Sequence, residues 1–172
     1  MKRRLLVAAV VGLLLAGCGG GAGVRTESAS TSASGSSASV VCKTIDAHEV
    51  TELFYRWNRS LQVDARAVVA NYAPRSILLP TVSNKPRVTA AEKLDYFEHF
   101  LEDKPSGEIT FSFIETGCNS AFDAGLYTFK FARTGAKVAA RYTFTYAWDG
   151  RQWLITSHHS SKMPEGDAAA AK

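Results

Sequence analysis

The chain has 172 residues, of which 46% are hydrophobic, and its formal net charge is +4. Residues 1–17 contain three basic residues and no acidic one, so the rest of the chain carries a charge of only +1. A near-neutral chain without a basic stripe of interleaved aromatic residues has no electrostatic basis for binding nucleic acid, and we exclude that class of partner.

The first residues have the layout of an export signal. Residues 2–4 are basic and precede an apolar run at 5–16, which is too short to span a bilayer as a helix. The run closes with Leu15-Ala16-Gly17-Cys18, which resembles the lipobox of bacterial lipoproteins and implies cleavage before Cys18 and lipid attachment to it. We therefore expect a signal peptide at 1–17 and an exported protein that a lipid anchors to a bacterial membrane without a spanning helix. The alternative is an ordinary secretory signal with an incidental cysteine.

Composition divides the remainder of the chain into three parts. Residues 18–41 are mainly Gly, Ser, Ala and Thr, with too few large apolar side chains to offset the entropy lost on folding. We expect a flexible linker there, between the lipid on Cys18 and a folded domain at 42–165. Residues 166–172 are expected to be a disordered tail.

Two cysteines remain in the exported part, Cys42 before the first expected helix and Cys118 between two expected strands. An even number of cysteines in an oxidising compartment favours a disulfide, and no Cys or His residues nearby have the spacing of a zinc site. We expect a bridge between Cys42 and Cys118, with two buried free thiols as the alternative.

Two helices are expected at the start of the domain. Apolar residues recur at a spacing of three and four over residues 46–62, which indicates a helix with one buried face that includes Trp57. Asp64 has the position of an N-cap for a second, shorter helix, which continues to Tyr72 and stops near Pro74.

A short strand, a loop and a third helix follow. We expect the strand at 76–79 and the loop at 80–87, which contains Ser83-Asn84-Lys85-Pro86. Thr89, with Glu92 three residues later, forms a capping-box signature for a helix that ends before Pro105.

Beyond residue 107 the apolar period changes from that of a helix to that of a strand, because aromatic residues alternate with polar ones. The alternating aromatic residues are Phe111, Phe113, Tyr127, Phe129, Phe131, Tyr142, Phe144 and Tyr146. Asp149-Gly150 is a turn signal between the last two strands. Helices followed by antiparallel strands indicate an α+β domain, with three N-terminal helices packed on one face of a curved antiparallel sheet.

Five stretches of this chain resemble one superfamily. They are Phe54-Tyr55-Arg56-Trp57-Asn58, Leu78-Leu79-Pro80-Thr81-Val82-Ser83-Asn84, Asp95-Tyr96-Phe97, Asp123-Ala124-Gly125-Leu126-Tyr127-Thr128-Phe129 and the terminal hairpin. The order of elements and these stretches, over 46–165, are similar to the nuclear transport factor 2-like (SnoaL-like) superfamily. Within it they resemble bacterial proteins related to the association (hub) domain of calcium/calmodulin-dependent protein kinase II.

The resemblance implies a cone-shaped domain that dimerises through its sheet and, in the kinase, assembles into rings. It does not imply kinase activity, because the chain has no glycine-rich loop, catalytic Lys, His-Arg-Asp or Asp-Phe-Gly segment. Nor does it imply calmodulin binding, since that segment of the kinase lies outside its hub domain.

The cone of this superfamily usually encloses a pocket, and Arg141 is the sharpest candidate for it. Arg141 shares a strand face with Thr143, opposite the aromatic side chains of the same strand. The resemblance places a pocket arginine of the kinase hub at Thr143, so we expect this face to point into the cone. There Arg141 could hold a small carboxylate bidentately; the alternative is an Arg paired with an acid at an interface or pocket mouth.

His158, His159, Trp57 and Tyr72 complete the candidate pocket. The two histidines are neighbours on a strand and point to opposite faces, so they cannot hold one metal ion together. Alignment of the hairpin favours His158 on the Arg141 face, while His159 matches a hub histidine in position. Each histidine could instead be a hydrogen-bonded strand-end residue, and Trp57 and Tyr72 could be core residues. No residue is assigned as catalytic, and no metal or other cofactor is expected.

Two acids, Asp95 and Asp123, are the candidates for a catalytic base of the kind that isomerases and cyclases of this superfamily use. Asp95 is expected to be solvated on a helix and Asp123 to be a turn residue, so neither has a reason for a raised pKa.

The sequence therefore favours a homodimeric or larger binding and assembly module. The alternative is a pocket enzyme of the isomerase or cyclase type that acts through Arg141, His158 and Tyr72. A third hypothesis is a sensor domain that binds a ligand without converting it.

Overall fold

The computed structural model describes residues 41–81 and 83–164, which form three helices and five strands. The elements are α1 (Ala47–Ser60), α2 (Ala65–Val69), β1 (Tyr72–Leu79), α3 (Ala90–Leu101), β2 (Pro105–Gly117), β3 (Ser120–Phe131), β4 (Lys137–Trp148) and β5 (Trp153–Lys162). The predicted α+β fold is confirmed. The signal peptide, the lipidated Cys18, the linker except its last residue and the C-terminal tail lie outside the described residues.

Capping boxes start two of the helices. At α1 the Asp46 carboxylate accepts a hydrogen bond from the Glu49 amide at 2.8 Å, and the Glu49 carboxylate accepts one from the Asp46 amide at 3.0 Å. Thr89 and Glu92 make the same reciprocal pair at α3, as their spacing predicts. Each box pairs helix N–H groups that would otherwise lack partners, so these two boundaries follow from local sequence.

The second helix is shorter than predicted, and Tyr72 belongs to a strand instead. The side-chain amide of Asn71 donates to the carbonyls of Ala67 and Val68 at 2.9 and 3.2 Å, which ends α2. The Asn71 carbonyl then accepts a hydrogen bond from the Ile155 amide in β5. The chain has therefore already joined the sheet where periodicity alone would continue the helix.

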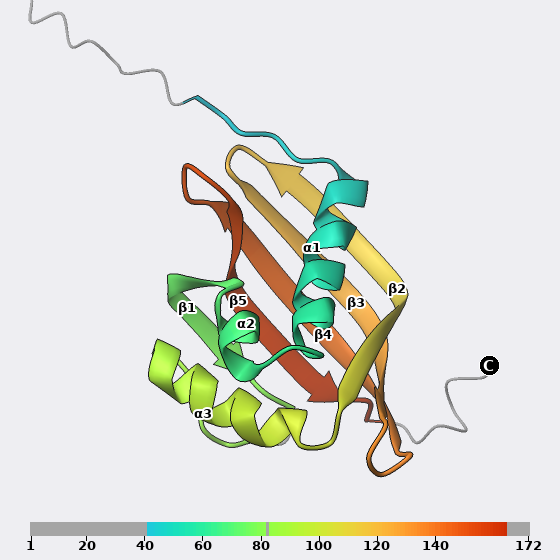
Figure 1. Ribbon diagram of the computed structural model, residues 1–172. Helices are drawn as coiled ribbons and strands as arrows, with labels where there is room; N and C mark the ends of the chain where they lie inside the picture. The colour runs from blue at the N-terminus through green and yellow to red at the C-terminus, as the bar shows by residue number, and fades with distance from the viewer. Residues whose placement is uncertain (1–40, 82, 165–172) are drawn as a thin grey trace, which may run out of the picture. The chain divides into compact units, whose positions relative to one another are not determined.

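The sheet has the strand order β1-β5-β4-β3-β2. Four strands pair antiparallel to their neighbours in chain order, while β1 pairs parallel to β5. The three helices lie over one face of the curved sheet, and within residues 41–81 and 83–164 no helix lies on the other face (Figure 1). We call these the inner and the outer face.

A cluster of aromatic side chains fills the space between α1 and the inner face. Trp57 and Phe54 of α1 pack against Phe144 of β4 with ring centroids 5.5 and 6.0 Å apart. All three are at most 1% exposed. The aromatic residues of β4 therefore face the helices, because burial of large apolar rings stabilises the fold far more than burial of Thr or Arg side chains would.

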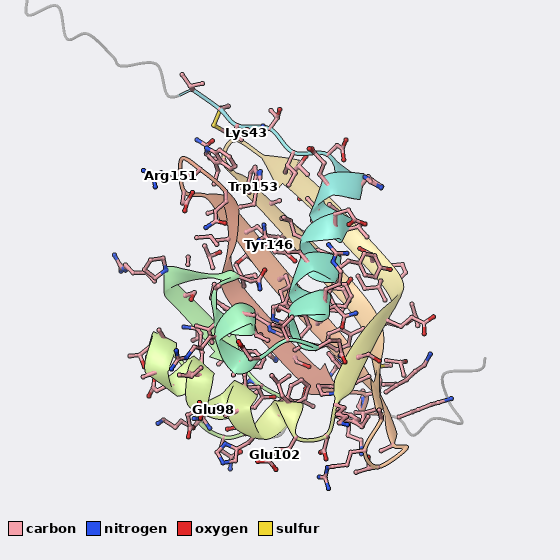
Figure 2. The ribbon with its side chains drawn as sticks, viewed as in Figure 1. Lys43, Glu98, Glu102, Tyr146, Arg151 and Trp153 are labelled. Atoms are coloured by element: carbon pink, nitrogen blue, oxygen red, sulfur yellow. A yellow bond between two sulfur atoms is a disulfide. The ribbon has the colours of Figure 1, made fainter. Side chains whose placement is uncertain are left out.

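The predicted disulfide between Cys42 and Cys118 is confirmed, with Cα atoms 4.9 Å apart. It joins the segment before α1 to the β2–β3 turn, where Lys43 also exchanges two hydrogen bonds with Asn119. The Lys43 ammonium lies 5.5 Å from the ring centroid of Trp148. Figure 2 shows Lys43 at the end of the molecule that carries Arg151 and Trp153, opposite Glu98 and Glu102. This segment is thus attached at several points before the first helix begins.

Buried Lys93 ties α3 to the rest of the domain. Its ammonium group donates to the carbonyls of Ser76 and Val88 at 2.9 Å each, and Lys93 is 1% exposed. These carbonyls lie in β1 and just before α3, so one side chain connects both ends of the intervening loop.

None of the helices in the described ranges has the length and apolarity needed to cross a bilayer.

Candidate functional site

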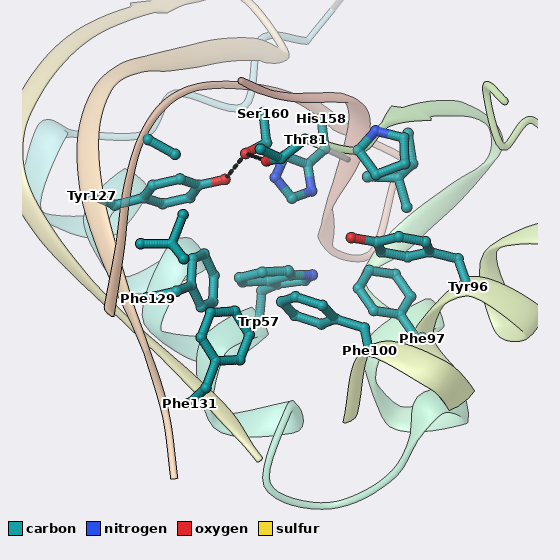
Figure 3. Close-up of a pocket in the computed structure, with 14 residues that line it drawn as sticks. Trp57, Thr81, Tyr96, Phe97, Phe100, Tyr127, Phe129, Phe131, His158 and Ser160 are labelled. Carbon is teal, nitrogen blue, oxygen red and sulfur yellow. Dashed lines mark hydrogen bonds between the residues drawn. The ribbon is translucent and has the colours of Figure 1, made fainter. Parts of the chain in front are cut away.

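A cavity of about 110 Å³ lies between α1, α3 and the inner face of the sheet. Its walls are Trp57, Leu78, Pro80, Thr81, Tyr96, Phe97, Phe100, Tyr127, Phe129, Phe131, Val138, Ala140, His158 and Ser160. Figure 3 shows aromatic rings along most of this wall, with polar side chains gathered at one end beside His158. We call this space the inner cavity.

Three hydroxyl groups meet at the polar end of the inner cavity. The Tyr127 hydroxyl donates to the Ser160 Oγ atom at 2.6 Å, and the hydroxyls of Ser160 and Thr81 are hydrogen-bonded to each other (Figure 3). Burial raises the pKa of Tyr127, so its hydroxyl keeps its proton. Because each hydroxyl both donates and accepts, this trio can hold a water molecule or a ligand oxygen.

His158 lies beside the hydroxyl trio, enclosed by aromatic residues. Its ring stacks on Phe144 with centroids 4.0 Å apart and meets the edge of Trp57 at 5.2 Å. Its Nδ1 atom lies 2.8 Å from the Tyr72 hydroxyl, whereas Nε2 is buried and has no hydrogen-bond partner among the described residues. Burial lowers the pKa of His158 to about 3, so the ring is neutral at physiological pH.

Among the described residues that line the inner cavity, none is Asp, Glu, Lys or Arg. The walls therefore offer apolar surface, hydroxyl groups and one neutral imidazole. Such a site favours a small, uncharged molecule that can accept or donate a few hydrogen bonds, since a full charge would lose its hydration without gaining an ion pair.

Two of the six predicted pocket residues, Trp57 and His158, line the inner cavity. Tyr72 is 7% exposed and contacts His158 through the hydrogen bond between its hydroxyl group and Nδ1. Tyr72 itself does not line the cavity. These three side chains come from α1, β1 and β5 and lie close together, and Tyr72 belongs to a strand and not to the predicted helix.

The prediction that the face of β4 with Arg141 and Thr143 points into the cone is wrong. The opposite face of this strand, with Tyr142, Phe144 and Tyr146, packs on the helices. Arg141 is exposed and Thr143 half-buried, and both lie on the outer face. The expected carboxylate site at Arg141 is therefore absent from the inner cavity, because aromatic side chains displace polar ones from the buried face.

The assignment of His158 to the Arg141 face is also wrong, and a bulge explains why. Near the Asp149-Gly150 turn, Tyr146 pairs with Ile155, but the register then shifts by one residue, so that Thr145 pairs with Ser157. A regular hairpin would have paired Thr143 with His158. One extra residue in β5 turns His158 to the inner face and His159 to the outer one, where His159 is exposed.

Arg141 and His158 lie on opposite faces of the sheet, which contradicts the hypothesis of an isomerase or cyclase that uses both residues in one pocket. The histidines do point apart, as predicted. Within residues 41–81 and 83–164, no group of three His, Cys, Asp or Glu side chains is arranged to hold a metal ion.

The hydroxyl trio was not predicted. Ser160 is not among the predicted pocket residues, and Thr81 falls in the predicted loop at 80–87. A usable signal was present for Ser160, since it lies two residues after His158 on the same strand and must share its face. Thr81 and Tyr127 come from distant segments, and only the folded chain brings them to Ser160.

Asp123 corrects another prediction, because it is a buried strand residue and not a turn residue. It lies in β3 and is 0% exposed. Its Oδ1 atom accepts hydrogen bonds from Ser112 Oγ at 2.5 Å and from the Tyr142 hydroxyl at 3.0 Å, while Oδ2 has no partner among the described residues. Burial raises the pKa of Asp123, although these two hydrogen bonds oppose the rise. Asp123 is not part of the inner cavity.

Comparison with known families gives one match that covers most of the domain. Residues 46–164 match the family model described as calcium/calmodulin dependent protein kinase II association domain. A solved structure described by the same name, from Xanthomonas campestris, is 45% identical in sequence. The match covers 70% of this chain and 90% of that one, with a TM-score of 0.66. No curated protein matches the chain.

More distant solved structures share the fold. One is an iota-carbonic anhydrase from a cyanobacterium, complexed with bicarbonate, with 19% identity, a TM-score of 0.64, and coverage of 73% of this chain and 97% of that one. Another is a nuclear transport factor 2-like protein with a cystatin-like fold from Novosphingobium aromaticivorans, with 13% identity and a TM-score of 0.59. That match covers 73% of this chain and 87% of the other. At these identities the likeness concerns the fold alone.

Proposed function

Since this chain belongs to the calcium/calmodulin dependent protein kinase II association domain family, we propose that it is a homo-oligomerisation module whose subunits pair through the outer face of the sheet. Association domains are oligomerisation modules, which fits this assignment. The observation that carries the proposal is a pair of half-exposed phenylalanines, Phe111 and Phe113, on the outer face, which none of the three described helices covers.

The outer face has the composition of a surface that a partner covers. Phe111 is 57% and Phe113 is 52% exposed, and the ring of Phe113 packs on Phe122 with centroids 5.9 Å apart. Phe111 pairs across the strands with Leu126, which continues the apolar surface. Arg141 follows next in that row and gives the apolar surface a polar edge on this side, as at the rim of many protein interfaces.

Phe113→Asp is expected to convert the full chain from an oligomer into a monomer at micromolar concentration. An aspartate there would place an unpaired charge inside the interface, whereas in the free subunit it would be solvated. Native mass spectrometry or light scattering of the full chain measures the mass. Val63→Asp is the matched control, because Val63 is 72% exposed but lies between α1 and α2, away from the outer face. A wild-type monomer, or equal dissociation of both variants, would contradict the proposal.

A second function is favoured by the hydroxyl trio of Thr81, Tyr127 and Ser160, together with neutral His158. We propose that the inner cavity binds carbon dioxide and water and catalyses their conversion to bicarbonate. The support is threefold: apolar aromatic walls suited to carbon dioxide, a volume suited to a molecule of few atoms, and fold similarity to a carbonic anhydrase complexed with bicarbonate.

In this reaction the oxygen of a water molecule forms a bond to the carbon of carbon dioxide. One C=O π pair moves onto an oxygen, the water loses one proton to the buffer, and the products are bicarbonate and H⁺. The Ser160 and Thr81 hydroxyls would orient the attacking water, and hydrogen bonds to the product oxygens would stabilise the charge that develops. The apolar wall would favour neutral carbon dioxide over the anionic product and so assist product release.

Ser160→Ala is expected to lower kcat/KM for carbon dioxide hydration about 10- to 100-fold, because the water would lose the group that orients it. Stopped-flow measurement of proton release by the full chain tests this. Ser161→Ala is a matched control: Ser161 is the next residue of β5 and pairs with exposed Arg141 on the outer face. No hydration above the buffer rate in the wild type, or unchanged activity in Ser160→Ala, would overturn the assignment.

We also propose that the protein is exported and anchored to a bacterial membrane through lipid on Cys18. The disulfide between Cys42 and Cys118 supports an oxidising, extracytoplasmic location. Metabolic labelling with a palmitate analogue should mark the wild-type protein in the membrane fraction, and Cys18→Ala should remove the label and the export processing. Equal labelling of both proteins would contradict the anchor.

A further inference from the structure

The two ring nitrogens of His158 have different surroundings. Nδ1 lies 2.8 Å from the hydroxyl oxygen of Tyr72, while Nε2 is buried without a hydrogen-bond partner in the described part of the chain. His158 lines the inner cavity and Tyr72 does not. Tyr72 therefore acts on the ring from behind the cavity wall, and Nε2 is the ring nitrogen left for a molecule inside it. A buried polar atom without a partner calls for such an explanation.

The position of the Tyr72 proton decides whether Nδ1 of His158 accepts or donates the hydrogen bond between the two side chains. Burial raises the pKa of Tyr72 well above its ordinary value, so its hydroxyl keeps its proton. A protonated phenol is a stronger hydrogen-bond donor than acceptor, and an unprotonated imidazole nitrogen is a strong acceptor, so Tyr72 directs its proton to Nδ1, which then accepts.

The charge of the His158 ring determines where its own proton lies. The His158 ring is enclosed by Trp57 and Phe144 and is 4% exposed, an environment that disfavours the charged imidazolium. A neutral imidazole carries one proton, and if Nδ1 accepts from Tyr72 the proton must be on Nε2.

We propose that Tyr72 is a positioning residue that holds His158 in its Nε2-protonated tautomer, so that His158 donates this N–H to an oxygen atom of the molecule in the inner cavity. This inference rests on the proposal that the inner cavity is a binding site, and it names the chemistry that the site accepts: a small molecule with an oxygen acceptor. In carbon dioxide hydration the N–H would stabilise the negative charge on the forming bicarbonate. His158 would then not be the base that removes the proton from water.

Nitrogen NMR of the ¹⁵N-labelled full chain tests the tautomer without any activity. The shifts and long-range couplings of the His158 ring should show a proton on Nε2 and an unprotonated Nδ1 at neutral pH. Tyr72→Phe removes the donor to Nδ1, and a second population with the proton on Nδ1 is expected. Tyr96→Phe is the matched control, because it deletes a hydroxyl from the cavity wall that has no hydrogen bond to His158 among the described contacts.

Bicarbonate is the probe for the ligand oxygen, added at a concentration high enough to offset the weak binding that an uncharged cavity gives an anion. Its addition should shift the His158 Nε2–H signal, and Tyr72→Phe should weaken the apparent affinity about tenfold, the effect of one well-placed hydrogen bond. His159→Gln should leave the affinity unchanged, since His159 lies on the outer face. A proton on Nδ1 in the wild type, or a tautomer unaffected by Tyr72→Phe, overturns the inference. The expected tautomer without any response to bicarbonate supports the role of Tyr72 and overturns the carbon dioxide assignment instead.

Discussion

Replacement of both Cys42 and Cys118 with serine is expected to lower the free energy of unfolding by about 4–5 kcal/mol. The bridge joins residues separated by 76 positions, and in the chain-entropy model a loop of this length strongly restricts the unfolded chain. The folded state should keep its structure, because Lys43 and Asn119 still exchange hydrogen bonds at the same place. The main effect is therefore expected on the unfolded ensemble.

Urea unfolding of the wild-type chain and of the double variant measures this difference. The wild-type protein in the presence of reductant is the control and should match the double variant, because both lack the same bridge. The variant should also expose more surface on unfolding and give a larger m-value. A double variant within 1 kcal/mol of the oxidised wild type, on the order of a single weak hydrogen bond, would show that residual structure or strain removes the benefit of the bridge.

Gly125→Ala is expected to destabilise the domain by about 3 kcal/mol or more. A Cβ atom at Gly125 would overlap the carbonyl oxygen of Phe111 in the neighbouring strand and lie 2.8 Å from its carbonyl carbon. Both atoms are backbone and cannot rotate away, so β2 and β3 would have to separate locally. The close approach occurs where the register of these strands shifts between Ile109 and Phe111, at a bulge.

The control for Gly125→Ala is Gly117→Ala in the same hairpin. The nearest atom to a Cβ at Gly117 is the Ser120 Oγ at 3.0 Å, which is the end of a side chain and can rotate. Thermal and urea unfolding of both variants should show a large loss for Gly125→Ala and a small change for Gly117→Ala. Equal stability of the Gly125→Ala variant and the wild type would mean that the bulge can relax without loss of pairing.

Most of the fold was predictable because its signals are local. Capping boxes set the starts of α1 and α3, and the change from helical to alternating period separated the helices from the strands. The end of α2 was not predictable in this way. The Asn71 side chain and a hydrogen bond from Ile155, more than 80 residues away in the chain, decide that Tyr72 begins a strand.

The candidate site was predictable only in part. Of the predicted pocket residues, Trp57 and His158 line the inner cavity and Tyr72 contacts His158, although Tyr72 lies in a strand and not in the predicted helix. Arg141, Thr143 and His159 were assigned to the pocket, but alternation shows only that two sets of side chains face apart and not which set faces the helices. Asp123, which lies outside the inner cavity, was assigned to a turn because a carboxylate in an alternating aromatic strand gives no local sign that Ser112 and Tyr142 will donate hydrogen bonds to it.

The sequence by itself determined the α+β class, the family resemblance, the pairing of the two cysteines and the absence of kinase motifs, because each of these follows from local patterns or from a residue count. Only the tertiary structure decided which face of the sheet is buried and which histidine enters the inner cavity. The physical reason is that a single extra residue in β5 inverts every side chain beyond it. The hydroxyl trio of Thr81, Tyr127 and Ser160 likewise exists only where three distant segments meet.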